Sequence, residues 1–63
     1  MKNEEIIQYY DYLIRLATSK CNSQNDAQDL VEDTMLAAFA YMHRGGVIEH
    51  AKTWLTNTLY HKY

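Results

Sequence analysis

Residues 26–39 read DAQDLVEDTMLAAF, and this stretch has the clearest helical pattern in the chain. At 100° per residue, its apolar positions, continued to Met42, fall within an arc of roughly 140°, which is wide enough to face a core. These core-facing positions are Ala27, Leu30, Val31, Thr34, Met35, Ala38 and Met42. The opposite arc carries four carboxylates, Asp26, Asp29, Glu32 and Asp33. The stretch therefore predicts a helix with one buried face and one acidic face.

The acidic arc has two unusual properties. The helix contains no Lys or Arg that could neutralise it, and Asp29 and Asp33 repel each other at i,i+4 spacing. Leu36 points outward among the acids, and Phe39 lies at their edge. A face of this kind is typical of docking on a basic, partly apolar partner, because a merely solvated face is usually mixed in sign. Two alternatives stay open: a solubilising face whose acids favour the helix N-terminus, and self-association through Leu36 and Phe39.

The composition favours one small all-α domain. The chain has 63 residues, of which 48% are hydrophobic, so one core can form near the lower size limit for folding without disulfides or metal. Proline is absent, and glycine occurs only as Gly45-Gly46. The one cysteine, Cys21, excludes an internal disulfide and is typical of a reducing compartment. We expect Cys21 to be a small core residue at the end of the first helix.

The sequence also predicts where the protein works. No apolar run follows a basic start at the N-terminus, so no signal peptide is expected. No stretch has the length and hydropathy of a membrane span. We therefore expect a cytoplasmic protein with no membrane partner.

Three helical stretches are predicted, at about residues 4–21, 26–43 and 51–62, and short loops allow them to share one core. The predicted fold is an all-α, compact three-helix bundle that forms a single domain over residues 1–63. The central helix can begin with Asn25 as N-cap and Gln28 behind it, or with Ser23 as N-cap, and Gly45-Gly46 ends it. Because the sequence stops within or just after a helix, the chain is also compatible with an excised piece of a longer protein.

The flanking helices show the same division into faces. In the first helix, the predicted core positions are Ile6, Tyr10, Leu13, Ile14, Ala17 and Cys21. The tyrosines at 9, 10 and 12 predict core and rim packing, with a stacking platform as the alternative. In the third helix, the predicted core positions are Ala51, Leu55, Thr58 and Leu59, with Trp54 beside them. Its predicted outward positions are Lys52, Thr53, Thr56, Asn57 and Tyr60.

Nothing in the sequence indicates an enzyme, a metal or a cofactor. The histidines His43, His50 and His61 are spaced by 7 and 11 residues, so no two lie on adjacent turns as a helical zinc pair requires. Gly45-Gly46 lacks the Lys and Ser/Thr of a phosphate-binding loop. The carboxylates lie on an exposed type of arc rather than in a pocket, which does not favour general acid catalysis.

Charge is distributed unevenly, although the net charge is only −2. Residues 22–42 contain four acids and no base, whereas residues 43–63 carry Arg44, Lys52 and Lys62 against Glu49. An acidic middle and a mildly basic end indicate two different partners.

Residues 26–39 resemble the DAEDLVQETFLRAW signature of bacterial sigma factors, especially of the extracytoplasmic-function group. Residues 9–17, YYDYLIRLA, are similar to that family's opening helix. Residues 48–55, IEHAKTWL, resemble its I-x-N-P-K-x-W-L entry to the next helix. The resemblance extends from about Tyr9 to Tyr63, and the central signature and the Trp54-Leu55 pair are specific together.

The resemblance implies a sigma factor region 2 domain, which is not an enzyme. In that family the central helix docks on the clamp helices of the RNA polymerase β′ subunit. The following loop and helix recognise and melt the minus-ten promoter element and hold bases flipped from the non-template strand. The polymerase-binding residues implied here are Asp29, Glu32, Asp33 and Leu36. DNA contact is implied for Gly45-Gly46, the connector at residues 47–50, and His43, Arg44, Lys52, Asn57, Tyr60, His61 and Lys62.

A second function stays open. The family's third helix usually continues as W-L-Y-R-I-A-R-N, whereas Asn57 and Tyr60 stand here in place of two arginines, which would contact phosphates. The alternative is a protein-interaction module without DNA binding of its own, such as a sigma-like co-regulator or a domain that binds an anti-sigma factor. Salt-sensitive binding to single-stranded promoter DNA separates the two functions.

Overall fold

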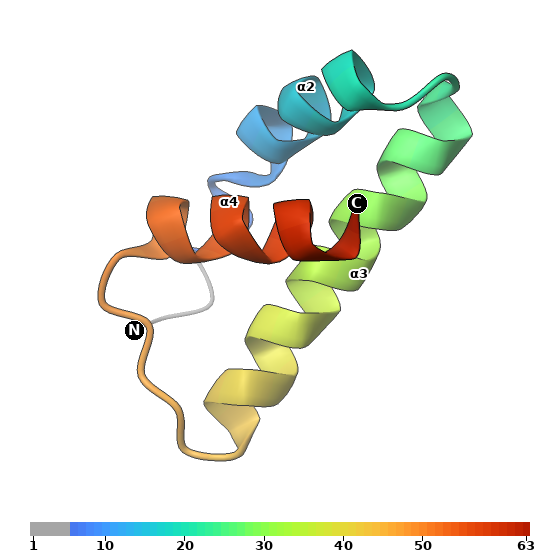
Figure 1. Ribbon diagram of the computed structural model, residues 1–63. Helices are drawn as coiled ribbons and strands as arrows, with labels where there is room; N and C mark the ends of the chain where they lie inside the picture. Colours follow the sequence, from blue (N-terminus) through green and yellow to red (C-terminus); the bar gives the residue numbers. More distant parts are fainter. Residues whose placement is uncertain (1–5) are drawn as a thin grey trace.

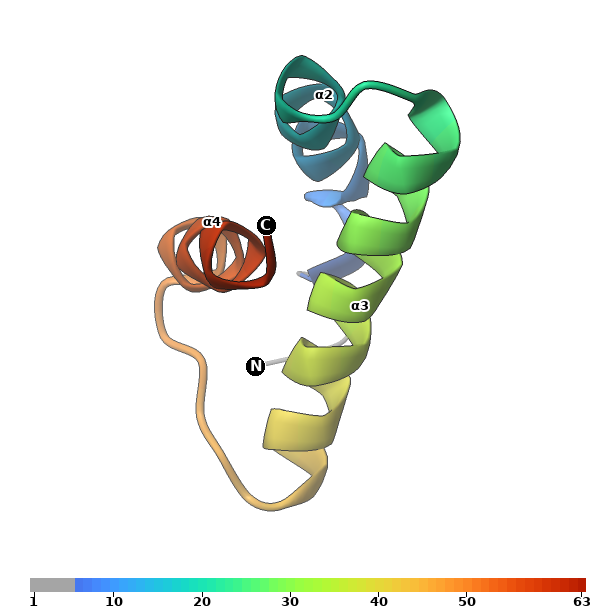
Figure 2. The same ribbon diagram turned by 45° about the vertical axis from the view of Figure 1, so that its right-hand side comes forward.

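The computed structural model describes residues 6–63, and over that range its long elements are three α-helices, with no strand. They are α2 (Tyr10–Lys20), α3 (Gln24–His43) and α4 (Ala51–Lys62). α3 is the longest helix, and α2 and α4 both lie on one side of it (Figures 1 and 2). The predicted all-α three-helix bundle is confirmed.

One core joins the three helices and the connector. Its fully or nearly buried apolar members are Ile6, Leu13, Ala17, Ala27, Leu30, Val31, Met35, Ala38, Ile48, Ala51, Leu55 and Leu59. The polar member is Thr34, whose hydroxyl donates to the Leu30 carbonyl oxygen at 2.8 Å and is thereby satisfied. Six of the seven positions expected to face the core in the central helix are buried, and Met42 packs half-buried against the same cluster.

The first helix differs from the expected span of residues 4–21. Ile6 and Ile7 are helical, a turn follows at Gln8-Tyr9, and α2 begins only at Tyr10. The Tyr9 N–H donates to the Ile6 carbonyl at 3.1 Å across this turn, and the side chain of Ile6 still reaches the core. The expected residues 4 and 5 lie outside the described range. Of the six positions expected in the core of this segment, Ile6, Leu13 and Ala17 are buried, whereas Tyr10, Ile14 and Cys21 are only half-buried and pack against the core from its rim. Tyr9 and Tyr12 are also half-buried and show the expected rim packing.

Ser23 is the N-cap of α3, so the helix begins at Gln24 rather than at residue 26. The Ser23 side-chain oxygen accepts from the Asp26 N–H at 3.1 Å, which satisfies one of the free donors at a helix start. Of the two predicted caps, Ser23 is correct and Asn25 is wrong. Asn25 is itself inside the first turn of α3.

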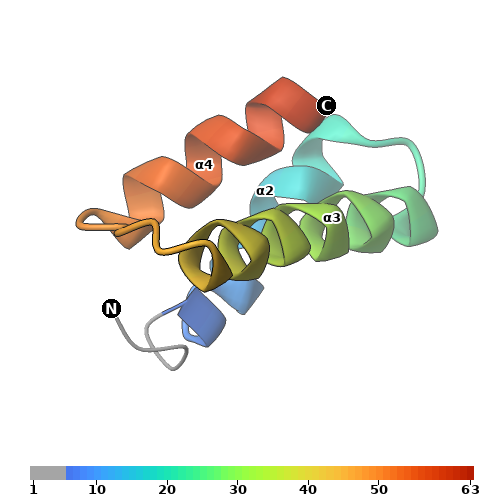
Figure 3. The ribbon, with the colours of Figure 1, turned by 90° about the horizontal axis from the view of Figure 1, so that it is seen from below.

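Gly45 and Gly46 end α3 in a Schellman motif. The Gly45 N–H donates to the Met42 carbonyl at 3.0 Å, and the Gly46 N–H donates to the Tyr41 carbonyl at 2.9 Å. Gly45 has φ +93°, a conformation that residues with a side chain rarely adopt. The connector then turns back toward α4, as the view from below shows (Figure 3).

α4 begins at Ala51, as the sequence predicts, but one of its faces differs from the expectation. Thr56 was expected to point outward and is instead half-buried, because its Oγ1 lies 3.3 Å from the Tyr12 Oη of α2. Thr58, expected in the core, is also half-buried, and its hydroxyl donates to the Trp54 carbonyl at 2.8 Å. The other predicted positions of α4 lie as expected, with Trp54 half-buried beside the core.

Candidate functional site

The side chains on the acidic face of α3 take no part in the packing of the core. Asp29, Glu32 and Asp33 are exposed, and Leu36 exposes 64% of its surface among them. Because the helix buries its opposite side against α2 and α4, these four side chains stand together on the outside of the bundle. An exposed leucine surrounded by three carboxylates suits a partner that offers both basic and apolar groups.

A groove lies next to this acidic face, between α2 and α3. It has a volume of about 290 Å³ and is lined by Tyr10, Glu32, Met35 and Leu36. The sequence assigned Glu32 and Leu36 to the outer face but placed Tyr10 and Met35 in the core. Tyr10 is only half-buried, and Met35 keeps 8% of its surface exposed, so both reach the groove from the core side.

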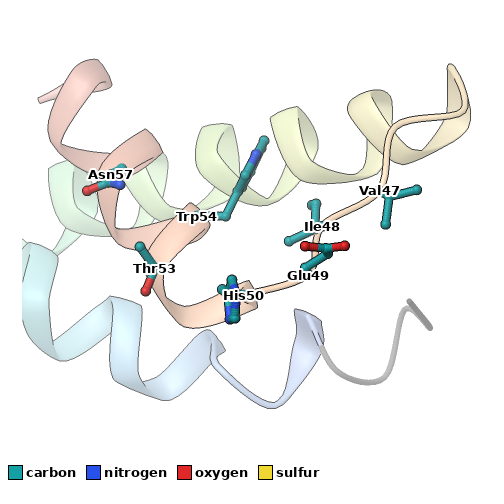
Figure 4. A pocket seen from close by; sticks show the side chains of 7 residues that line it. All are labelled: Val47, Ile48, Glu49, His50, Thr53, Trp54 and Asn57. Carbon is teal, nitrogen blue, oxygen red and sulfur yellow. The ribbon is translucent and has the colours of Figure 1, made fainter.

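A second hollow lies between the connector and the beginning of α4, and it has a volume of about 350 Å³. Figure 4 shows the side chains that border it, which are Val47, Ile48, Glu49, His50, Thr53, Trp54 and Asn57. We call this space the connector hollow. Val47 and Trp54 offer apolar and aromatic surface, whereas Glu49, His50, Thr53 and Asn57 offer hydrogen-bonding groups. A flat ring with polar edges fits this combination of groups.

Tyr41 of α3 supports the connector hollow from behind. Its ring centroid lies 5.6 Å from that of Trp54, with the two planes tilted by 30°. A Cβ atom added at Gly46 would lie 2.5 Å from the Tyr41 ring, so the connector backbone passes close against that ring. Ile48 anchors the same segment, because its side chain is only 1% exposed. The position of the hollow therefore depends on packing contacts of α3.

The structure does not bring the sequence-predicted DNA residues into one patch. Of that set, Asn57 and the connector residues 47–50 line the connector hollow. His43 and Arg44 lie at the C-terminal end of α3, whereas His61 and Lys62 lie at the C-terminal end of α4, and Figure 1 shows these ends apart. The Lys52 ammonium lies 4.8 Å from the centre of the Tyr12 ring, and Tyr60 packs under the Lys20 ammonium at 5.2 Å.

Sequence reasoning named the connector only as a segment and did not identify the hollow. Ile48 and Trp54 have the pattern of packing residues, and Glu49 and Thr53 carry no distinctive spacing. A signal was present in the local sequence, because Trp54 follows closely on a connector that two glycines precede.

Within residues 6–63, no three His, Cys, Asp or Glu side chains are grouped so that they could hold a metal ion. No helix in the same range is long and apolar enough to cross a bilayer.

Comparison with known proteins gives one family. The family model described as Sigma-70 region 2 matches residues 6–63, which include α2, α3, α4 and both surfaces described above. No significant match was found among curated proteins or among solved structures.

Proposed function

Because the chain belongs to the sigma-70 region 2 family, we propose that it docks on the β′ clamp helices of RNA polymerase through α3 and binds the non-template strand of the minus-ten element through the connector hollow and α4. The family consists of non-enzymatic domains of transcription initiation, whose general partners are the polymerase core and promoter DNA. The proposal assigns each of these two partners to one surface of the chain. It also places the chain in the extracytoplasmic-function group and in the cytoplasm, where bacterial transcription occurs.

The observation that carries the docking proposal is the exposure of Leu36 among Asp29, Glu32 and Asp33. A large apolar side chain that is 64% exposed contributes nothing to the core, and the neighbouring like charges repel one another. Both features become favourable only when a complementary surface covers them. The groove at Tyr10 and Met35 adds an apolar recess that could receive a partner side chain.

The connector hollow supports the DNA half of the proposal. Recognition of a flipped base needs an aromatic or apolar surface for stacking and polar groups that reach the base edge. Trp54 and Val47 offer the first, and Asn57 and Thr53 offer the second. The cationic residues Arg44, Lys52 and Lys62, with His43, Tyr60 and His61, are the proposed contacts to phosphates and to other bases.

Docking is tested by binding of the purified chain to the isolated β′ clamp helices. The variant Asp33→Arg reverses a charge in the middle of the acidic face and is expected to abolish binding while the helix content is unchanged. Asp11→Arg makes the same charge change at an exposed position of α2 and serves as the control, which is expected to bind normally. Normal binding by Asp33→Arg would contradict the docking proposal.

DNA binding is tested with a single-stranded oligonucleotide of the minus-ten element and the variant Asn57→Ala. We expect weaker binding at unchanged stability, because Asn57 is exposed and makes no packing contact in the core. The second candidate function, a co-regulator or an anti-sigma-binding module without DNA contact, is favoured by one observation: the hollow carries the Glu49 carboxylate, which repels phosphate. That function predicts clamp-helix binding without any salt-sensitive binding of DNA.

A further inference from the structure

Two lysine–tyrosine pairs join α2 to α4, and each helix supplies one lysine and one tyrosine. The Lys52 ammonium of α4 lies 4.8 Å from the centre of the Tyr12 ring of α2. The Lys20 ammonium of α2 lies 5.2 Å from the centre of the Tyr60 ring of α4. Both distances are within the range of a cation–π interaction. We call this line of contact the α2–α4 seam.

Hydrogen bonds hold the same seam at both ends. Near Lys52, the Tyr12 Oη lies 3.3 Å from the Thr56 Oγ1. Near Lys20, the Tyr63 hydroxyl donates to the Lys20 carbonyl oxygen at 2.8 Å. The hydrogen bonds hold the Tyr12 and Tyr63 hydroxyls in place, and aromatic surface stays accessible, since Tyr60 is 45% and Tyr63 is 63% exposed, whereas Tyr12 is half-buried. The seam thus presents ordered aromatic surface to solvent next to two cations.

The carboxylates of the described residues are concentrated on α3. Within residues 6–63, four of the six carboxylates belong to α3, and the other two are Asp11 and Glu49. The seam pairs contribute Lys20 and Lys52, and neither lysine is on α3. A positive surface interleaved with tyrosine rings is the combination that binds a single-stranded nucleic acid, because the cations meet phosphates and the rings stack with bases.

We propose that the α2–α4 seam is a binding track for single-stranded DNA, separate from the connector hollow. Residues 52 and 60 are eight positions apart in α4, so the two cation sites lie about 12 Å apart at 1.5 Å per residue. Two positive sites at this separation suit an extended strand better than a single small anion. The inference rests on the proposed DNA-binding function, but it adds Lys20, Tyr12 and Tyr63, which that function does not use.

The test compares oligonucleotides of two lengths in nuclear magnetic resonance titrations of the whole chain at several salt concentrations. A strand of about four nucleotides can occupy one site, whereas a strand of about twelve nucleotides can span the hollow and the seam. We expect Lys20→Gln to weaken binding of the longer strand and to reduce its logarithmic salt slope by about 0.7, the value for one phosphate contact on single strands. Binding of the shorter strand to the hollow should not change.

The matched control is Thr18→Glu, which lowers the net charge by one, as Lys20→Gln does. Thr18 is exposed and lies two residues before Lys20, so it points about 200° away around the helix. The salt slope for binding of the longer strand by the Thr18→Glu variant should equal that of the unmodified chain. The unfolding midpoint of each variant is measured in parallel, so that a loss of stability cannot be mistaken for a lost contact.

The outcomes separate this proposal from the proposed function. If Asn57→Ala weakens binding and Lys20→Gln leaves the slope unchanged, the seam is not a track, although the hollow is a site. If Lys20→Gln lowers the slope and Asn57→Ala has no effect, the seam is a site and the hollow is not. Equal binding of a duplex of the same length would overturn the assignment to single strands, and no DNA binding of any kind would overturn both proposals.

Discussion

The outer face of α3 and the connector hollow differ in whether the side chains that form them also pack in the core. On α3, Leu36 is 64% exposed and its acidic neighbours are exposed with it. In the hollow, Ile48 is 1% exposed and belongs to the core, and Trp54 packs on Tyr41. The same side chains therefore line the hollow and hold α4 against α3.

This difference determines what mutations can reveal. Substitutions on the outer face of α3 change what the surface offers a partner and leave the packing intact. Substitutions of Ile48 or Trp54 change the shape of the hollow and the stability of the bundle together. The two surfaces therefore need different experiments.

The largest effect is expected from Leu36→Glu. Binding to the β′ clamp helices should fall by about 30-fold or more, as it does when a central apolar contact is lost. The free energy of unfolding should stay within about 0.5 kcal/mol, since the side chain is exposed. Val47→Glu is the control, because Val47 is 67% exposed at the connector and is expected to leave clamp-helix binding unchanged. Unfolding caused by Leu36→Glu would place this residue in the core and remove the contrast.

Trp54→Ala should affect stability first. We expect a loss of about 2–3 kcal/mol, below the range for fully buried aromatic residues because Trp54 is only half-buried. Urea unfolding of the variant gives this value. It is followed by circular dichroism rather than by intrinsic fluorescence, because the substitution removes Trp54. Full stability of the variant would mean that Trp54 lines the hollow without supporting the fold.

Gly46→Ala should have a smaller effect at the same site. The added methyl group would meet the Tyr41 ring at 2.5 Å, so the ring or the connector must shift, at a cost of about 1–2 kcal/mol. We expect this shift to be visible as changed resonances of Trp54, whose ring lies against Tyr41. Gly45→Ala has free space around its methyl group and is strained only through its positive φ, so it should cost about 1 kcal/mol and leave Trp54 unaffected. Identical spectra for the two variants would contradict the role of Tyr41 as a support.

Ser23→Ala is expected to have the smallest effect, a loss of about 1 kcal/mol, because it removes the side-chain cap of α3. Asn25→Ala, inside the helix, should change stability by only a few tenths of a kcal/mol. Chemical denaturation of both variants measures the difference. Both variants should retain binding to the clamp helices. Stability would then change without any change in what the acidic face of α3 offers a partner.

The sequence predicted α3 well because the spacing of its residues alone indicates which side of the helix is buried and which is exposed. Leu30, Val31 and Thr34 recur at helical spacing and are buried, and Leu36 breaks that spacing and is exposed. Such a pattern is local, so no knowledge of α2 or α4 is needed to read it. The family resemblance of the same stretch agrees with the match over residues 6–63.

The hollow and the seam could not be predicted because they depend on how the helices meet. Thr56 has an outward position on α4 when the helix is considered alone, and only the approach of Tyr12 makes it half-buried. The turn at Gln8-Tyr9 has no glycine or proline to mark it. The connector residues acquire their arrangement from Ile48, which enters the core, and from the Tyr41 ring, which limits the backbone at Gly46.

Both ends of α3 are fixed by contacts between residues that are close in sequence. The Ser23 cap at Asp26 and the bonds of Gly45 and Gly46 to residues 41 and 42 each close a very short loop, which costs little chain entropy. We therefore expect α3 to form early as the chain folds, with Trp54 and Ile48 arriving later from a connection that must first be closed. During folding, the helix proposed to dock on the polymerase would then form before the surface proposed to bind DNA.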